Sequence, residues 1–88
     1  MSEKVVIPKT VEEAIEFLDG HLKEDDKEFL IEKGAIAAHS TLGRWIRNNW
    51  GLWKSSELKG LLMEKGFSDP DEMSNYIIEE YIKHLKKN

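Results

Sequence analysis

The sequence predicts an all-α fold, a compact bundle of four or five short helices in a single domain. Apolar residues recur at intervals of three and four, which is the spacing of a helix face. Helix start signals precede several of these stretches, and no paired alternating segments indicate strands. Because 88 residues bury too little apolar surface for two cores, we expect an extended N-terminal lead-in over residues 1–9 and a single helical domain over residues 10–88.

The first predicted helix begins after Thr10. Thr10 and Glu13 have the spacing of a capping box, in which each side chain accepts a hydrogen bond from a backbone amide of the first turn. One face of this helix carries the apolar residues Val11, Ala14, Ile15, Leu18 and Leu22. Gly20 places its end near residues 19–22.

The second helical segment contains all three tryptophans. Asp25 or Asp26 is its expected N-cap. An apolar series then follows at helical intervals: Ile31, Ala35, Ala38, Leu42, Trp45, Ile46, Asn49 and Trp53. Residues 26–50 form either one long helix or two stacked helices, and two are favoured because Gly34 costs about 1 kcal/mol relative to alanine in a helix interior. Gly51 is the expected end.

Two more helices complete the bundle. Ser55 or Ser56 caps the third, which points Leu58, Leu61 and Leu62 inward and ends at Gly66. The last helix has the clearest start, with Asp69 as N-cap and Pro70 in the first turn. It runs to about Lys86. Its inner face carries Met73, Ile77, Ile78, Tyr81, Ile82 and Leu85.

The composition excludes several classes of site. There is no cysteine, which excludes disulfides, thiolate nucleophiles and Cys-ligated metals. No stretch approaches the roughly 18 apolar residues of a membrane span, and the apolar N-terminal part is too short for a signal peptide. The three histidines do not have the spacing of metal ligands. We therefore expect a cytoplasmic protein with no cofactor, no metal, no membrane contact and no enzymatic activity.

The charge distribution is uneven. The formal net charge is −4, yet no acidic residue occurs from Lys33 to Ser56. That segment carries the cations Lys33, Arg44, Arg47 and Lys54. The tryptophan segment is therefore a positive island in an acidic chain.

A helical wheel of this segment predicts a candidate binding surface. On a continuous helix, Trp45 and Trp53 fall on the apolar side and are expected in the core, whereas Arg44, Arg47 and Asn48 fall opposite. Two guanidinium groups there suit carboxylates or phosphates. The alternative interpretation is a solvated face on which the arginines pair with nearby acids.

Trp50 lies about 90° from the apolar stripe on the same wheel. It is the best candidate for a partly exposed ring on which a ligand or partner could stack, with core packing as the alternative. Asn49 falls on the apolar face. We expect its amide to bond backbone groups at the helix end.

Two motifs resemble the signature of a small bacterial domain family of unknown function. They are the stretch Trp45-Ile46-Arg47-Asn48-Asn49-Trp50-Gly51-Leu52-Trp53 and the helix start Asp69-Pro70-Asp71-Glu72-Met73-Ser74. The resemblance covers roughly Pro8 to Leu85. It implies a compact helical domain of bacterial or phage origin, with Arg47, Asn48, Trp50 and Trp53 as signature positions, and it carries no activity or cofactor.

Two functional hypotheses follow. The first is a non-enzymatic interaction domain that binds a protein partner through a basic, Trp-flanked surface of Arg44, Arg47, Asn48, Trp50 and Lys54. The alternative is a small nucleic-acid-binding domain that uses the same basic island, with Arg44, Arg47 and Lys54 on phosphates. We expect a monomer or a weak homodimer.

Overall fold

The computed structural model describes residues 7–53 and 56–87. Residues 1–6 of the predicted lead-in lie outside this range, as do Lys54 and Ser55. The described chain forms five α-helices: α1 (Val11–His21), α2 (Glu24–Lys33), α3 (Arg44–Asn49), α4 (Glu57–Glu64) and α5 (Pro70–Lys87). A 3₁₀ turn, η1 (Ile36–Ala38), and a π-helical turn, η2 (His39–Gly43), lead into α3. No strand occurs in the described ranges, which confirms the all-α prediction.

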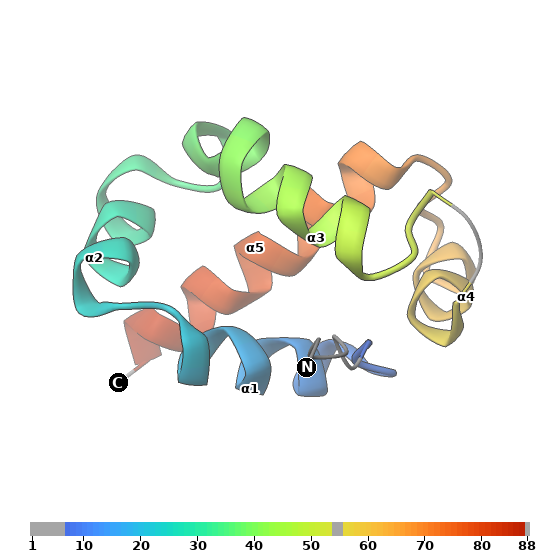
Figure 1. Ribbon diagram of the computed structural model, residues 1–88, viewed down its shortest axis with the longest axis horizontal. Helices are drawn as coiled ribbons and strands as arrows, with labels where there is room; N and C mark the ends of the chain where they lie inside the picture. Colours follow the sequence, from blue (N-terminus) through green and yellow to red (C-terminus); the bar gives the residue numbers. More distant parts are fainter. Residues whose placement is uncertain (1–6, 54–55, 88) are drawn as a thin grey trace, which may run out of the picture.

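The longest helix, α5, is the central element. It runs diagonally behind the others and contacts α1, α2, η2 and α3. In Figure 1, α1 lies along one side of it, η2 and α3 cross the opposite side, and α2 and α4 close the two ends. The predicted inner face of α5 is confirmed, since Met73, Ile77, Ile78, Tyr81 and Ile82 are buried and Leu85 packs at the margin of the core.

Three of the predicted helix starts are confirmed by hydrogen bonds. Thr10 Oγ1 accepts from the Glu13 amide, Ser56 Oγ accepts from the Lys59 amide, and Asp69 Oδ1 accepts from the Asp71 amide. The predicted cap of α2 is wrong. This helix begins earlier, with Lys23 at the cap, and Asp26 sits in the first turn and accepts from the Lys23 amide.

The helical segment predicted over residues 26–50 is interrupted at Gly34, which confirms the favoured alternative of two helical segments. Gly34 has φ of 85°, in the region that only glycine adopts without strain, and it follows directly on α2. Gly51 ends the second segment with φ of 71°. In α2 itself the buried residue is Leu30, and the expected Ile31 is exposed.

The π-helical turn η2 changes which face of the following helix is buried. A π turn contains an extra residue, so side chains beyond it are rotated by about 100° from their places on a continuous α-helix. The predicted stripe through Leu42, Asn49 and Trp53 therefore moves by one position. Ile46 is buried as predicted, and the residues buried with it are Gly43, Arg47 and Trp50.

This shift reverses the predicted roles of the tryptophans. Trp50 is completely buried, whereas Trp45 is 36% and Trp53 58% exposed. The predictions that Trp45 and Trp53 are core residues and that Trp50 is partly exposed are therefore wrong. The wheel failed because it assumed 3.6 residues per turn throughout the segment.

Candidate functional site

Arg47 lies inside the domain and not on the predicted surface. Its side chain is 8% exposed, and its guanidinium group contacts three partners. Nη1 donates to Ser74 Oγ at 2.9 Å, Nη2 donates to the His39 carbonyl oxygen at 3.2 Å, and Nε lies 3.3 Å from Asp71 Oδ1. Arg47 therefore ties η2 to the first turns of α5.

Gly43 makes the room for this guanidinium group. A Cβ atom on Gly43 would lie 3.0 Å from Arg47 Nη1 and 3.6 Å from Ser74 Oγ. Ser74 is itself fully buried, and its hydroxyl also bonds the Asp71 carbonyl oxygen at 3.1 Å. Because the fork geometry of arginine fits these separate acceptors, the arrangement is a structural clamp.

Trp50 is the second predicted site residue that the fold buries. Its ring packs edge-on against Phe17 and Trp45, with centroid distances of 5.6 and 5.7 Å. The indole Nε1 has no acceptor among the described residues. Trp50 cannot offer a stacking surface to a ligand in this arrangement.

The other predicted site residues do not rebuild the expected surface. Arg44 and Asn48 are exposed and lie one helical turn apart. Asn48 Oδ1 accepts a hydrogen bond from the exposed Trp53 at 3.0 Å. Lys54 lies outside the described residues. The fold thus keeps Arg44 and Asn48 outside, and takes Arg47 and Trp50 inside.

A concave surface with a largely apolar lining lies elsewhere on the domain. A hollow of about 360 Å³ is lined by Phe17, Leu18, His21, Leu22, Thr41, Leu42 and Trp45. A second hollow of about 180 Å³ is lined by Leu22, Asp26, Phe29, Leu30, Ala38, Thr41 and Leu42. The two share three lining residues and therefore adjoin each other, between α1 and α2 on one side and η2 and α3 on the other. We call the pair of hollows the apolar groove.

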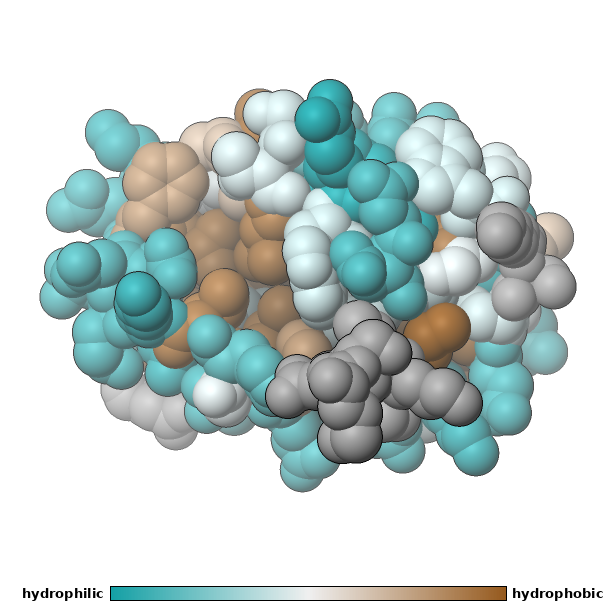
Figure 2. Space-filling view, in the orientation of Figure 1, coloured by the Kyte–Doolittle hydropathy of each residue, from teal (hydrophilic) through white to brown (hydrophobic). Residues whose placement is uncertain are grey.

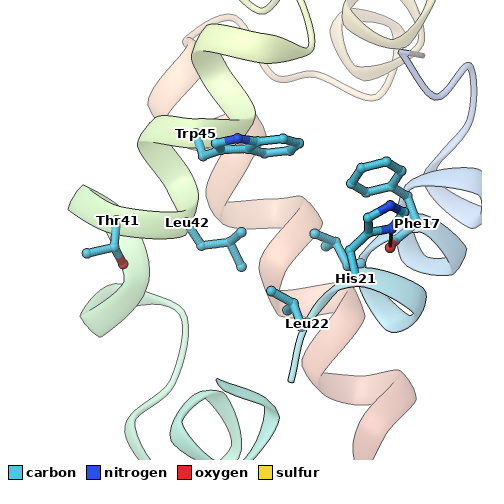
Figure 3. A pocket seen from close by; sticks show the side chains of 7 residues that line it. Phe17, His21, Leu22, Thr41, Leu42 and Trp45 are labelled. Carbon is cyan, nitrogen blue, oxygen red and sulfur yellow. Dashed lines mark hydrogen bonds between the residues drawn. The ribbon is translucent and has the colours of Figure 1, made fainter. Parts of the chain in front are cut away.

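The figures show the character of the apolar groove. In Figure 2, hydrophobic residues gather in a hollow on the left half of the face, between the α1–α2 side and the η2–α3 side. In Figure 3, Leu42 and Trp45 point across the groove towards Phe17, His21 and Leu22. Phe29 is 44% exposed at the margin of the smaller hollow.

An aromatic stack forms one wall of the groove. His21 stacks on Phe17 at a centroid distance of 3.9 Å, and Phe17 stacks on Trp45 at 5.8 Å. His21 Nδ1 bonds the Phe17 carbonyl oxygen at 2.8 Å. Because the buried Trp50 supports Phe17 and Trp45 from inside, this wall is preformed.

Three polar side chains of the groove each make a hydrogen bond within the chain. Thr41 Oγ1 donates to the Ala38 carbonyl oxygen at 3.3 Å, and Asp26 Oδ2 accepts from the Lys23 amide at 3.3 Å. With His21 also bonded, the groove offers mainly apolar and aromatic surface. Such a surface recognises apolar side chains by burial and shape.

Sequence reasoning missed the groove because its residues come from separate helices. Phe17 and Phe29 carried the only available signal, since both are large aromatic residues that lie off the predicted inner faces of their helices. Aromatic residues on outer faces mark an interaction surface only where the fold gathers them into one patch. Nothing local to the sequence shows that η2 and Trp45 lie opposite them.

The fold and the groove define a small all-helical domain with an apolar surface depression. The chain belongs to the family described as a domain of unknown function, DUF6794, whose family model matches residues 7–85. This range confirms that a family of unknown function covers nearly the whole chain. The bacterial origin and the signature positions stay predictions. No curated protein and no solved structure matches the chain.

Two further observations concern the described residues only. None of their helices is both long and apolar enough to cross a membrane. They also contain no group of three or more histidine, aspartate or glutamate side chains placed to hold a metal ion.

Proposed function

We propose that this protein is a non-enzymatic interaction domain that binds a protein partner through the apolar groove. The observation that carries the proposal is the groove itself, a preformed depression whose exposed rings, Trp45 and Phe29, lie at its two hollows. Apolar surface that stays exposed and concave on a small domain is typical of interaction sites.

The chemistry of the groove supports binding without catalysis. General acid–base catalysis needs a titratable group within hydrogen-bonding reach of a substrate. The groove contains His21 and Asp26, and each is bonded to the backbone of its own helix or cap. A protein partner needs no such group, because burial of apolar side chains supplies its affinity.

The groove replaces the basic surface as the first candidate for the binding site. Of the five residues proposed from the sequence, Arg44 and Asn48 are exposed on the outer face of α3. They lie on the same short helix as Trp45, and we assign them to the rim of the interface. Arg47 and Trp50 support the site from within.

The nucleic-acid alternative has less support than the protein-binding proposal. Its phosphate contacts included Arg47, whose guanidinium group is occupied by Ser74, His39 and Asp71. Arg44, Lys33 and Lys54 then remain as the cations of the island. Three phosphate contacts correspond to a salt slope of about −2.7 on duplex DNA, which is a weak electrostatic attachment.

Site-specific photo-crosslinking tests the proposed function. Benzoylphenylalanine in place of Phe29 keeps an aromatic ring at the groove, and the same residue in place of Glu64 on α4 is the matched control on another surface. After irradiation in the native cells, we expect protein adducts from position 29 that are absent from position 64. Equal adducts from both positions would refute the proposal, and nucleic-acid adducts would favour the alternative.

A further inference from the structure

We infer that the occupant of the apolar groove is an amphipathic helix of the partner, with lysine or arginine along the flank that faces α2. This inference rests on the proposed function and specifies its ligand class. Three features of the groove support it: the lack of a sheet edge beside it, the pairing of two hollows, and the charge of one rim.

A helix suits the groove better than an extended peptide does. An extended peptide leaves its backbone N–H and C=O groups to be bonded by the receptor, usually at a sheet edge. The described residues form no strand with which an extended peptide could pair. His21 Nδ1 and Thr41 Oγ1 are in addition already bonded within the chain. A helix satisfies its own backbone groups and can therefore lie on apolar surface with only its side chains engaged.

The two hollows adjoin each other, as neighbouring side chains of a helix do. They share Leu22, Thr41 and Leu42 in their linings, so one ligand can fill both. Residues at i and i+3 or i+4 of a helix project from one face with Cβ atoms about 5–6 Å apart. The larger hollow, beside Phe17 and Trp45, takes the bulkier of the two side chains.

The rim formed by α2 is acidic. The helix α2 carries five acidic residues and two lysines. One of those lysines, Lys27, is engaged by Asp19 at 3.4 Å and Glu24 at 3.5 Å. By contrast, the segment from Ile36 to Asn49 on the opposite side contains no acidic residue.

Acidic positions flank the exposed ring of Phe29. Asp25, Asp26, Glu32 and Lys33 lie three or four residues from Phe29 and so share its side of α2, where three acids and one lysine leave a net charge of −2. Asp26 also lines the smaller hollow. A helix seated in the groove therefore meets negative charge along one flank only, and basic residues on that flank set both its orientation and its specificity.

Fluorescence anisotropy with designed peptides tests the inference on the full chain. The probe is a labelled helical peptide with leucines at helical spacing and lysines along one flank. Two matched peptides carry glutamates in place of the lysines, or the same leucines and lysines in scrambled order. We expect the lysine peptide to bind at least about tenfold more tightly than either, with the advantage over the glutamate peptide shrinking as salt rises.

A charge-reversal pair locates the contact. The Asp25→Lys/Glu32→Lys variant should weaken the lysine peptide at least about tenfold. Glu64→Lys/Glu79→Lys makes the same change of net charge on exposed positions of α4 and α5, and it should change binding less than about twofold. Equal weakening by the two variants would overturn the assignment to the α2 rim.

The remaining outcomes also decide the question. If the lysine and glutamate peptides bind equally, the inference that the ligand carries a basic flank is wrong. If the scrambled peptide binds as tightly as the lysine peptide, the inference that the ligand is an amphipathic helix is wrong. A dimer in sedimentation that is lost on Phe29→Ser would make the occupant a second copy of this chain, against the inference. The proposed function fails separately, by the absence of adducts specific to position 29.

Discussion

At the residue scale, the two arginines of the basic island have different roles. Arg44 is exposed on α3, and Arg47 is buried against the start of α5. Arg47 satisfies the Ser74 hydroxyl, the His39 carbonyl group and the Asp71 carboxylate, which point at it from different directions. A buried charge is stable only when its partners are complete, so this residue stabilises the junction of η2 and α5.

Lysine substitutions separate these roles. Arg47→Lys keeps the charge but replaces three bonding directions by one ammonium group. We expect it to lower the free energy of unfolding by about 2–4 kcal/mol. This cost is somewhat smaller than that of breaking a fully buried ion pair, because Asp71 is half-exposed. Arg44→Lys should change it by less than about 0.5 kcal/mol. Urea unfolding followed by tryptophan fluorescence measures both, and equal effects would contradict the clamp.

At the scale of the element, the π turn η2 determines what the tryptophan segment buries. Its extra residue brings Gly43, Ile46 and Trp50 inward, and leaves Leu42 and Trp45 facing the groove. Gly43 lies at the end of this turn, where a side chain would press on Arg47. The lack of a side chain there therefore serves packing, whereas Gly20 in α1 has no neighbour within 4 Å of a Cβ position.

Two alanine substitutions distinguish these glycines. Gly20→Ala should raise the free energy of unfolding by about 0.5–1 kcal/mol, because alanine loses less backbone entropy in a helix. Gly43→Ala should lower it by about 1–2 kcal/mol, because its Cβ displaces the Arg47 guanidinium group. In the Arg47→Lys background the Gly43→Ala cost should shrink. If both substitutions stabilise the protein in thermal or urea unfolding, a Cβ atom at position 43 does not press on the Arg47 guanidinium group.

At the scale of the whole molecule, α5 joins helices that are far apart in the sequence. The Tyr81 hydroxyl donates to Asp19 Oδ1 of α1 at 3.2 Å, and Lys27 of α2 binds the same carboxylate oxygen at 3.4 Å. The burial of Tyr81, and then its bond to Asp19 and the charge there, raise the pKa of this phenol above its ordinary value near 10. The folded domain therefore keeps the hydroxyl protonated.

The stability should depend on pH through this residue. The pKa of Tyr81 is higher in the folded chain than in the unfolded chain. The contribution of Tyr81 to the free energy of unfolding is therefore complete below about pH 10 and is lost as the pH rises above that value. Relative to Tyr81→Phe, the wild-type free energy of unfolding should fall above about pH 10 with a slope approaching 1.4 kcal/mol per pH unit. Urea unfolding at several pH values measures it. Parallel curves for the two proteins would contradict the assignment.

The sequence by itself determined the fold class and most helix boundaries. Caps such as Thr10 and Asp69 act through hydrogen bonds within one turn, and the inner face of α5 repeats over a single unbroken helix. These are local interactions, so residue type and spacing are enough to predict them. The helical segments that end at Gly34 and Gly51 were predictable for the same reason, because glycine conformation is a local property.

Only the tertiary structure decided which surfaces the domain presents. With one extra residue in η2, Trp50 and Arg47 lie inside and Trp45 lies outside. Two of the three partners of Arg47, Asp71 and Ser74, belong to α5, and Ser74 is 27 residues away in the sequence. The apolar groove has the same origin, since Phe17 and Trp45 meet only when α1 and α3 pack on α5. Contacts between distant segments depend on the relative rotation of the helices, and a regular periodicity cannot report a local change in that rotation.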